Sequence, residues 1–132
     1  MMGRSAKPFD IVQMFAALAD PTRLRLLNLM QGREVCVCFF VQVLKLPQPK
    51  ISRHLAYLRK AGIVSSRPEG KWMHYSILRP TDAGACAILD AALKSFRDSP
   101  QMRSDLSRLG AATCESQRFV SRNRVPTAVT RL

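Results

Sequence analysis

Two cysteines separated by one residue, Cys36 and Cys38, are the residues whose type and spacing point most directly to chemistry. Thiolates are soft ligands, and a close pair suits thiophilic centres such as trivalent arsenic or antimony, which accept up to three thiolates in a pyramid. Cys114 is the first candidate for a third thiolate because it follows Leu109-Gly110 in a stretch that could fold back onto its own or the partner subunit. Cys86 is the weaker candidate, since it lies on a predicted helix, where a cysteine is commonly a small buried hydrophobe.

The helix predicted around the thiol pair restricts how both sulfurs could bind one ion. The sequence predicts a helix from Cys36 to Leu44, and residues i and i+2 of a helix point about 200° apart. The two sulfurs would then meet on one ion only after the first turn had unwound. Because this helix leads into residues 45–61, ion binding is predicted to move that segment.

Hydrophobic periodicity and turn signals predict a mainly α protein with a small β-hairpin. Helices are expected at about 8–19, 21–31, 36–44 and 49–61, then after Pro80-Thr81-Asp82, with a further short helix at 102–109. The third and fourth helices, joined by Lys45-Leu46-Pro47, outline a helix-turn-helix. Strands at 63–67 and 71–78 around Pro68-Glu69-Gly70 form its predicted wing.

The fourth helix is predicted to carry the DNA-reading side chains. Ile51, Leu55 and Leu58 follow an i, i+4, i+7 pattern that fixes its inward face and leaves a polar face outside. Arg53 is the predicted base contact, whereas His54 more commonly packs or forms a hydrogen bond. The candidate DNA-binding residues of this helix and the wing are Gln48, Lys50, Ser52, Arg53, His54, Tyr57, Arg67 and Lys71.

Composition restricts the class of protein and its partners. A chain of 132 residues, 47% of them apolar, suits one compact domain with tails. A formal charge of +12 indicates a polyanionic partner, although charge alone does not distinguish DNA, RNA and an anionic membrane. No apolar run approaches the roughly 20 residues that span a bilayer, and no signal peptide is apparent. The sequence therefore predicts a cytoplasmic protein with reduced thiols.

Three segments together resemble the ArsR/SmtB family: Leu-Ala-Asp-Pro-Thr-Arg-Leu-Arg-Leu-Leu at 18–27, Glu-Val-Cys-Val-Cys at 34–38, and the run from Ser52 to Val64. The Cys-Val-Cys element resembles the arsenite-sensing branch. The resemblance covers residues 9–97 and implies a winged helix-turn-helix repressor that dimerises through its first and C-terminal helices. It further implies a homodimer that leaves double-stranded operator DNA when As(III) or Sb(III) binds, with no organic cofactor and no membrane partner.

Two departures from the family pattern limit what is carried over. Arsenite-sensing relatives often follow the cysteine pair with an aspartate, or with a third cysteine three residues after the second; here these positions hold Phe39 and Val41. A third sulfur would have to come from elsewhere in the chain. Residues 81–97 contain no histidine, so the zinc site that some members carry on the dimer helix is not expected.

The expected organisation is a flexible arm (1–8), a winged-helix domain (9–97), an extension carrying Cys114 (98–115) and a basic, disordered tail (116–132). A thiol-redox-switched repressor is the main alternative function, and a thiol metal carrier is a further one. An enzyme is not expected, because redox catalysis usually uses Cys-x-x-Cys near a strand-helix-strand unit and no acid-base constellation is present.

Overall fold

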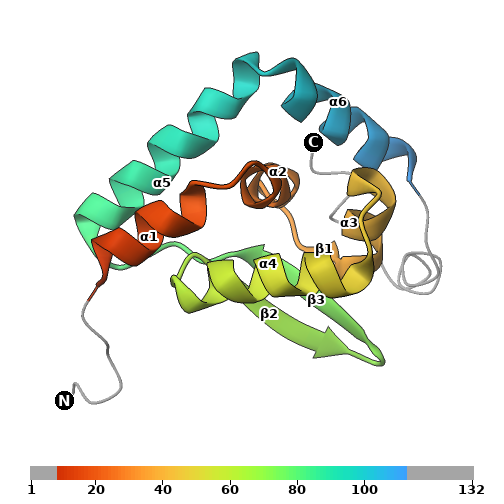
Figure 1. Cartoon of the computed structure of the whole chain (residues 1–132), viewed down its shortest axis with the longest axis horizontal. Helices are drawn as coiled ribbons and strands as arrows, with labels where there is room; N and C mark the ends of the chain where they lie inside the picture. The colour runs from red at the N-terminus through yellow and green to blue at the C-terminus, as the bar shows by residue number, and fades with distance from the viewer. Residues whose placement is uncertain (1–8, 113–132) are drawn as a thin grey trace.

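The computed structural model describes residues 9–112, which form six α-helices, one 3-10 helix and three short strands (Figure 1). The winged-helix prediction is confirmed. In chain order the elements are α1 (Ile11–Leu18), α2 (Pro21–Leu29), β1 (Val35–Cys36), α3 (Val37–Leu44), α4 (Gln48–Lys60), β2 (Val64–Glu69), β3 (Trp72–Ile77), α5 (Ala83–Ser95), η1 (Phe96–Asp98) and α6 (Pro100–Ala111).

Short polar side chains start three of the helices. The carboxylates of Asp10 and Asp82 accept hydrogen bonds from backbone N–H groups in the first turns of α1 and α5, and the hydroxyl of Ser99 does the same for α6. Asp20 occupies the expected N-cap position of α2 but makes no capping bond. Its carboxylate instead faces Arg23 and His54.

The sheet contains one more strand than the predicted hairpin. β2 and β3 pair antiparallel as expected, and β1 adds to the other edge of β3, giving the order β1-β3-β2. Val35 lies opposite Tyr75 and Cys36 lies opposite His74. Cys36 therefore belongs to a strand and only caps α3, which corrects the prediction that the helix begins at Cys36.

Helix α2 is at the centre of the core. Figure 1 shows it nearly end-on, with α5 and α6 forming an arch on one side and α4 with the sheet on the other. The predicted inward face of α4 is confirmed, because Ile51, Leu55 and Leu58 are fully buried. Burial of this apolar surface holds the reading helix against the core. None of the helices in residues 9–112 has the length and hydropathy that crossing a membrane would require.

Helix α6 returns to the core instead of leaving it. Met102 and Leu109 are buried, and the Asn28 side chain of α2 donates a hydrogen bond to the Met102 carbonyl. Arg108 donates to the carbonyl of Val43, near the end of α3. The helix thus bridges α2 and α3, and its C-terminal end lies beside α3.

The turn between α3 and α4 depends on a strained residue. Lys45 has a φ of 59° and a ψ of 44°, a left-handed conformation that costs a residue with a Cβ about 1–2 kcal/mol. We expect Lys45→Gly to raise the free energy of unfolding by about 0.5–1 kcal/mol, because glycine relieves this strain but loses more entropy on folding. Urea unfolding measures the change. Lys50→Gly, inside α4, should lower the same quantity by about 1 kcal/mol, and a loss of stability in both variants would contradict the assignment of strain.

Candidate thiol site and DNA-binding surface

The two predicted thiol ligands are close together without any unwinding of α3. Cys36 is extended, with a φ of −74° and a ψ of 146°, and Cys38 lies in the first turn of the helix. The Sγ atoms are 3.6 Å apart. The expectation that the helix must unwind before the sulfurs can meet is wrong, because it assumed that both residues are helical.

This separation suits two thiolates on one ion. Thiolates bound at about 2.3 Å, with a pyramidal or tetrahedral angle between them, lie about 3.5–3.8 Å apart. Cys36 is only 2% exposed, and Cys38 is half-buried. Within residues 9–112 no group of three or more His, Cys, Asp or Glu side chains is placed to hold a metal ion.

The two candidates for a third sulfur have different positions. Cys114 lies outside the described residues. Cys86 is half-buried on α5, and Figure 1 shows α5 and α3 on opposite sides of α2. The structure therefore does not bring Cys86 to the thiol pair.

A charged contact connects the thiol segment to the wing. Arg67 of β2 donates from Nε and Nη2 to the carboxylate of Glu34, at 2.8 and 2.6 Å, and also pairs with Glu69 at 2.8 Å. The hydrogen bonds with Glu34 and then Glu69 raise the pKa of Arg67, and burial opposes them. Glu34 directly precedes β1, so this ion pair joins the backbone next to Cys36 to the predicted DNA-contacting hairpin.

The predicted reading face of α4 faces solvent over most of its length. The side chains of Gln48, Lys50, Arg53 and Tyr57 are exposed, while Ser52 is half-buried. Arg59, one turn beyond Leu55, instead donates to the hydroxyl of Ser66 in β2 at 2.8 Å. Helix and wing therefore present one continuous polar surface, and that surface contains the predicted base contact.

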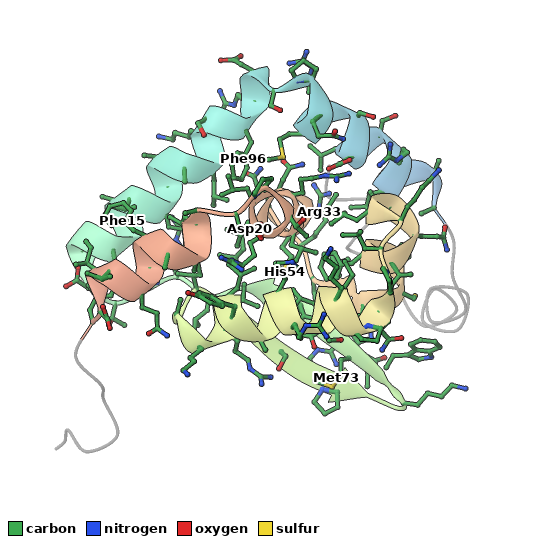
Figure 2. All side chains as sticks on the ribbon, in the orientation of Figure 1. Phe15, Asp20, Arg33, His54, Met73 and Phe96 are labelled. Atoms are coloured by element: carbon green, nitrogen blue, oxygen red, sulfur yellow. The ribbon has the colours of Figure 1, made fainter. Side chains whose placement is uncertain are left out.

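His54 lies on the inner side of this surface (Figure 2). Its Nδ1 is 3.2 Å from Nη1 of Arg23 and 3.4 Å from the Asp20 carboxylate. Burial lowers the pKa of His54; Asp20 opposes this, and Arg23, Lys50 and Arg53 add to it. The side chain therefore stays neutral near pH 7, in keeping with the packing role expected for it.

Arg23 connects three helices at this point. It donates to the carbonyls of Ala16 and Ala17 at the end of α1, and its guanidinium stacks over the ring of Tyr57 at 4.1 Å. Tyr57 is thus held in place by a residue of α2. At the far end of the wing, the ammonium group of Lys71 lies 5.7 Å from the ring centre of Trp72 and remains exposed.

Sequence reasoning missed strand β1 and the ion pair of Arg67. Arg67 was assigned only to DNA, although two glutamates hold it. The sequence contained one signal of this ion pair, namely an acid near each feature. Glu34 is the acid nearest the thiol pair, and Glu69 is the acid nearest the wing turn. Their meeting at one arginine depends on the β1–β3 pairing, which no local pattern in the sequence indicates.

Comparison with known proteins identifies relatives of this arrangement. Residues 20–66 match the family profile described as "Bacterial regulatory protein, arsR family". The chain is 42% identical over 91 residues to the arsenical resistance operon repressor of Escherichia coli (strain K12), covering 68% of this chain and 78% of that protein. It is 49% identical over 89 residues to the arsenic resistance transcriptional regulator ArsR1 of Pseudomonas putida, covering 67% and 66%.

Solved structures support the same fold. HlyU from Vibrio cholerae superposes with a TM-score of 0.57 at 28% identity, covering 73% of this chain and 98% of that one. The transcriptional repressor BigR from Xylella fastidiosa superposes with a TM-score of 0.52 at 29% identity, covering 65% and 85%.

Proposed function

Because the chain belongs to the arsR family of bacterial DNA-binding regulators, and is a transcriptional repressor of that family, we propose that it binds operator DNA as a homodimer and leaves it when arsenite or antimonite binds Cys36 and Cys38. The observation that carries this proposal is the 3.6 Å separation of the two sulfurs at the start of α3. The two soft sulfur atoms are preorganised there, which lowers the conformational cost of binding a thiophilic ion once Cys38, which is disulfide-bonded in this structure, is reduced.

Cys114 is the proposed third thiolate, supplied by the same subunit. Ala112, two residues before it, lines one shallow pocket together with Gln42 and Val43 of α3. Gln42 is one helical turn from Cys38, about 6 Å along the axis, and two extended residues span about 7 Å. The path of α6 therefore supports a ligand that closes onto the pair from the C-terminal side.

Release of DNA is proposed to begin at β1. An ion bound by Cys36, Cys38 and a third ligand pulls on a strand only two residues long. That strand is continuous with Glu34, whose carboxylate holds Arg67 of the wing. It is also continuous with α3, which packs against the reading helix α4. Binding at the thiols thus favours a different placement of both DNA-contacting elements.

Glu34→Gln tests the connection to the wing. We expect operator affinity to be unchanged or tighter, because Arg67 is freed to contact a phosphate. At saturating arsenite we expect two- to fivefold more DNA to remain bound, an effect of the size that an exposed ion pair contributes. Glu69→Gln is the matched control, since it also relieves Arg67 but leaves the contact with the thiol segment. Fluorescence anisotropy of labelled operator measures both. Equal retention of DNA by the two variants would show that Glu34 transmits nothing.

The homodimer is proposed to form through α1 and α5. Helix α1 exposes Ile11, Val12 and Phe15, with Val12 74% exposed, and Phe9 and Leu78, which line one pocket, are exposed as well. Exposed apolar side chains that gather on one face mark an interaction site. A two-fold dimer would place the two α4 helices about 34 Å apart, and the operator should then be an imperfect palindrome. Sedimentation equilibrium gives the assembly state directly.

Arg53 and Lys71 are proposed to read and to anchor DNA, respectively. Arg53→Ala should lower the ratio of operator to random-DNA affinity by about 5- to 150-fold, the value of one bidentate base contact. Lys71→Ala should weaken binding to both DNAs equally and reduce the slope of log affinity against log salt by about one. An unchanged affinity ratio in Arg53→Ala would refute the base contact.

The direct test of the function is anisotropy of DNA from upstream of the gene, titrated with reduced protein and then with arsenite, antimonite, cadmium and zinc. Release at near-stoichiometric arsenite or antimonite supports the proposal. The short distance between the sulfurs also favours one other function, a thiol-redox switch. Release by peroxide, with no response to any of the ions, would select that alternative.

A further inference from the structure

A cavity of about 720 Å³ lies between the α5–α6 arch and the C-terminal end of α2. Its walls come from the loop after α2, the end of β3, α5, η1 and α6. The volume is within the range of about 300–1,000 Å³ typical of small-molecule sites. The thiol pair, the reading helix and the wing turn contribute no residue to it.

The polar lining of this cavity is strongly cationic. Among the described residues it includes five basic side chains and one carboxylate. The carboxylate of Asp90 pairs with Arg79, and Arg103 donates to the backbone carbonyl of Arg97. Within residues 9–112 no acid forms an ion pair with the remaining cations of the lining, so the lining attracts anions. The charged residues of the lining are Arg33, Arg79, Asp90, Lys94, Arg97 and Arg103.

Arg33 is the most informative of these cations. Its Nε and Nη1 atoms are buried, and neither has a hydrogen-bond partner among the described residues. Burial lowers the pKa of this guanidinium. A buried donor without a partner costs about 1–3 kcal/mol, and more when it is charged. Such a group suits a site in which a ligand supplies the missing acceptor.

The rest of the lining is apolar. Leu93, Phe96 and Leu106 contribute from the α5–α6 arch, and Figure 2 shows Phe96 and Arg33 both beside the central helix α2. An inorganic anion would leave this surface in contact with water. A molecule with an apolar body and one anionic group would cover it while it paired with Arg33.

We propose that this cavity is a binding site for a small organic anion, with a carboxylate on an apolar body, and that Arg33 holds the carboxylate. Guanidinium and carboxylate groups form charge-assisted hydrogen bonds, which provide orientation as well as affinity. The site is separate from the thiol pair, and its existence does not depend on the response to arsenite.

Benzoate is the probe, with uncharged benzamide as its isosteric control and inorganic phosphate as the anion without an apolar body. Each compound is titrated into the full chain in a calorimeter at constant ionic strength, so that screening of charges is the same in every titration. Arg33→Met removes the proposed carboxylate contact. Arg53→Met is the matched control, because it removes one positive charge from an exposed site on α4, outside the cavity.

The wild type and Arg53→Met should bind benzoate alike and should not bind benzamide, whereas Arg33→Met should bind benzoate about tenfold or more weakly. Without ligand, Arg33→Met should have an unchanged or higher Tm, because it removes a partly buried charge whose desolvation disfavours the folded state. A lower Tm would show that Arg33 serves the fold and would overturn the proposal. Equal binding of benzamide, or phosphate binding without benzoate binding, would overturn the assignment of an organic anion.

Discussion

Replacing either Cys36 or Cys38 with serine is expected to leave operator affinity within about twofold of the wild type and to raise the arsenite concentration for half-release by about 100-fold or more. Four protein ligands bind structural zinc with a free energy of about 10–16 kcal/mol, so each ligand contributes roughly 3 kcal/mol, and we take this value for one thiolate. That loss corresponds to about a 100-fold weaker site. Anisotropy of operator DNA at fixed protein concentration gives both values in one titration.

Operator binding should survive these substitutions because the thiols are remote from the reading face. Cys36 caps α3 from β1, while the proposed base contact is on the exposed side of α4. Serine keeps the shape of the side chain, and the apolar core of α3 around Phe40 and Val43 is untouched. Cys86→Ser is the matched control, since it removes a half-buried thiol on α5, away from the pair. Release of Cys36→Ser and Cys38→Ser at the wild-type arsenite concentration would remove the thiol pair from the mechanism.

Cys114→Ser separates a two-thiolate site from a three-thiolate site. If Cys114 completes the site, its loss should weaken release nearly as much as loss of Cys38. If release is unchanged, the pair binds the ion with water or another ligand in the third position. The path of α6, which ends beside Gln42 and Val43 of α3, favours the first result.

The sequence predicts most of the fold because local patterns are strong where helices pack on a core. The spacing of Ile51, Leu55 and Leu58 sets the inner face of α4, and all three are buried as expected. The boundaries that failed lack such a pattern. Strand β1 has two residues and exists only because Val35 and Cys36 pair with Tyr75 and His74, about forty residues later. No periodicity can reveal so short a strand, and its absence from the prediction led to the wrong geometry for the thiols.

Contacts between distant residues were also beyond the reach of local patterns. Arg67 was expected to face DNA because it flanks a turn, but its guanidinium reaches Glu34, 33 residues earlier. Arg25 and Asp105 are 80 residues apart and form a bidentate ion pair. In both cases the residue types were compatible with many partners, and only the packing of the folded chain selects one.

Asp105 provides the largest expected effect on stability. Its side chain is 0% exposed and accepts hydrogen bonds from Arg25 Nε at 2.7 Å and Arg25 Nη2 at 3.0 Å, and from Gln101 and Arg108 at 3.0 and 3.1 Å. The hydrogen bond to Asp105 raises the pKa of Arg25, although burial partly opposes it. Asp105→Ala should therefore lower the free energy of unfolding by about 3–5 kcal/mol, because it leaves a partly buried guanidinium without its acid.

Urea unfolding followed by circular dichroism measures this loss, with Asp98→Ala as the matched control. Asp98 is exposed in η1, and its removal should change stability by less than about 0.5 kcal/mol. The double variant Arg25→Met with Asp105→Leu should recover most of the loss, since a buried ion pair can be replaced by apolar side chains at little cost. If the double variant is as unstable as Asp105→Ala, the stability comes from the other bonds of Asp105. Asp105 fixes α6 against α2. If Cys114 is the third ligand, Asp105→Ala should therefore also weaken the release of DNA by arsenite. The double variant should then restore both the stability and the release of DNA.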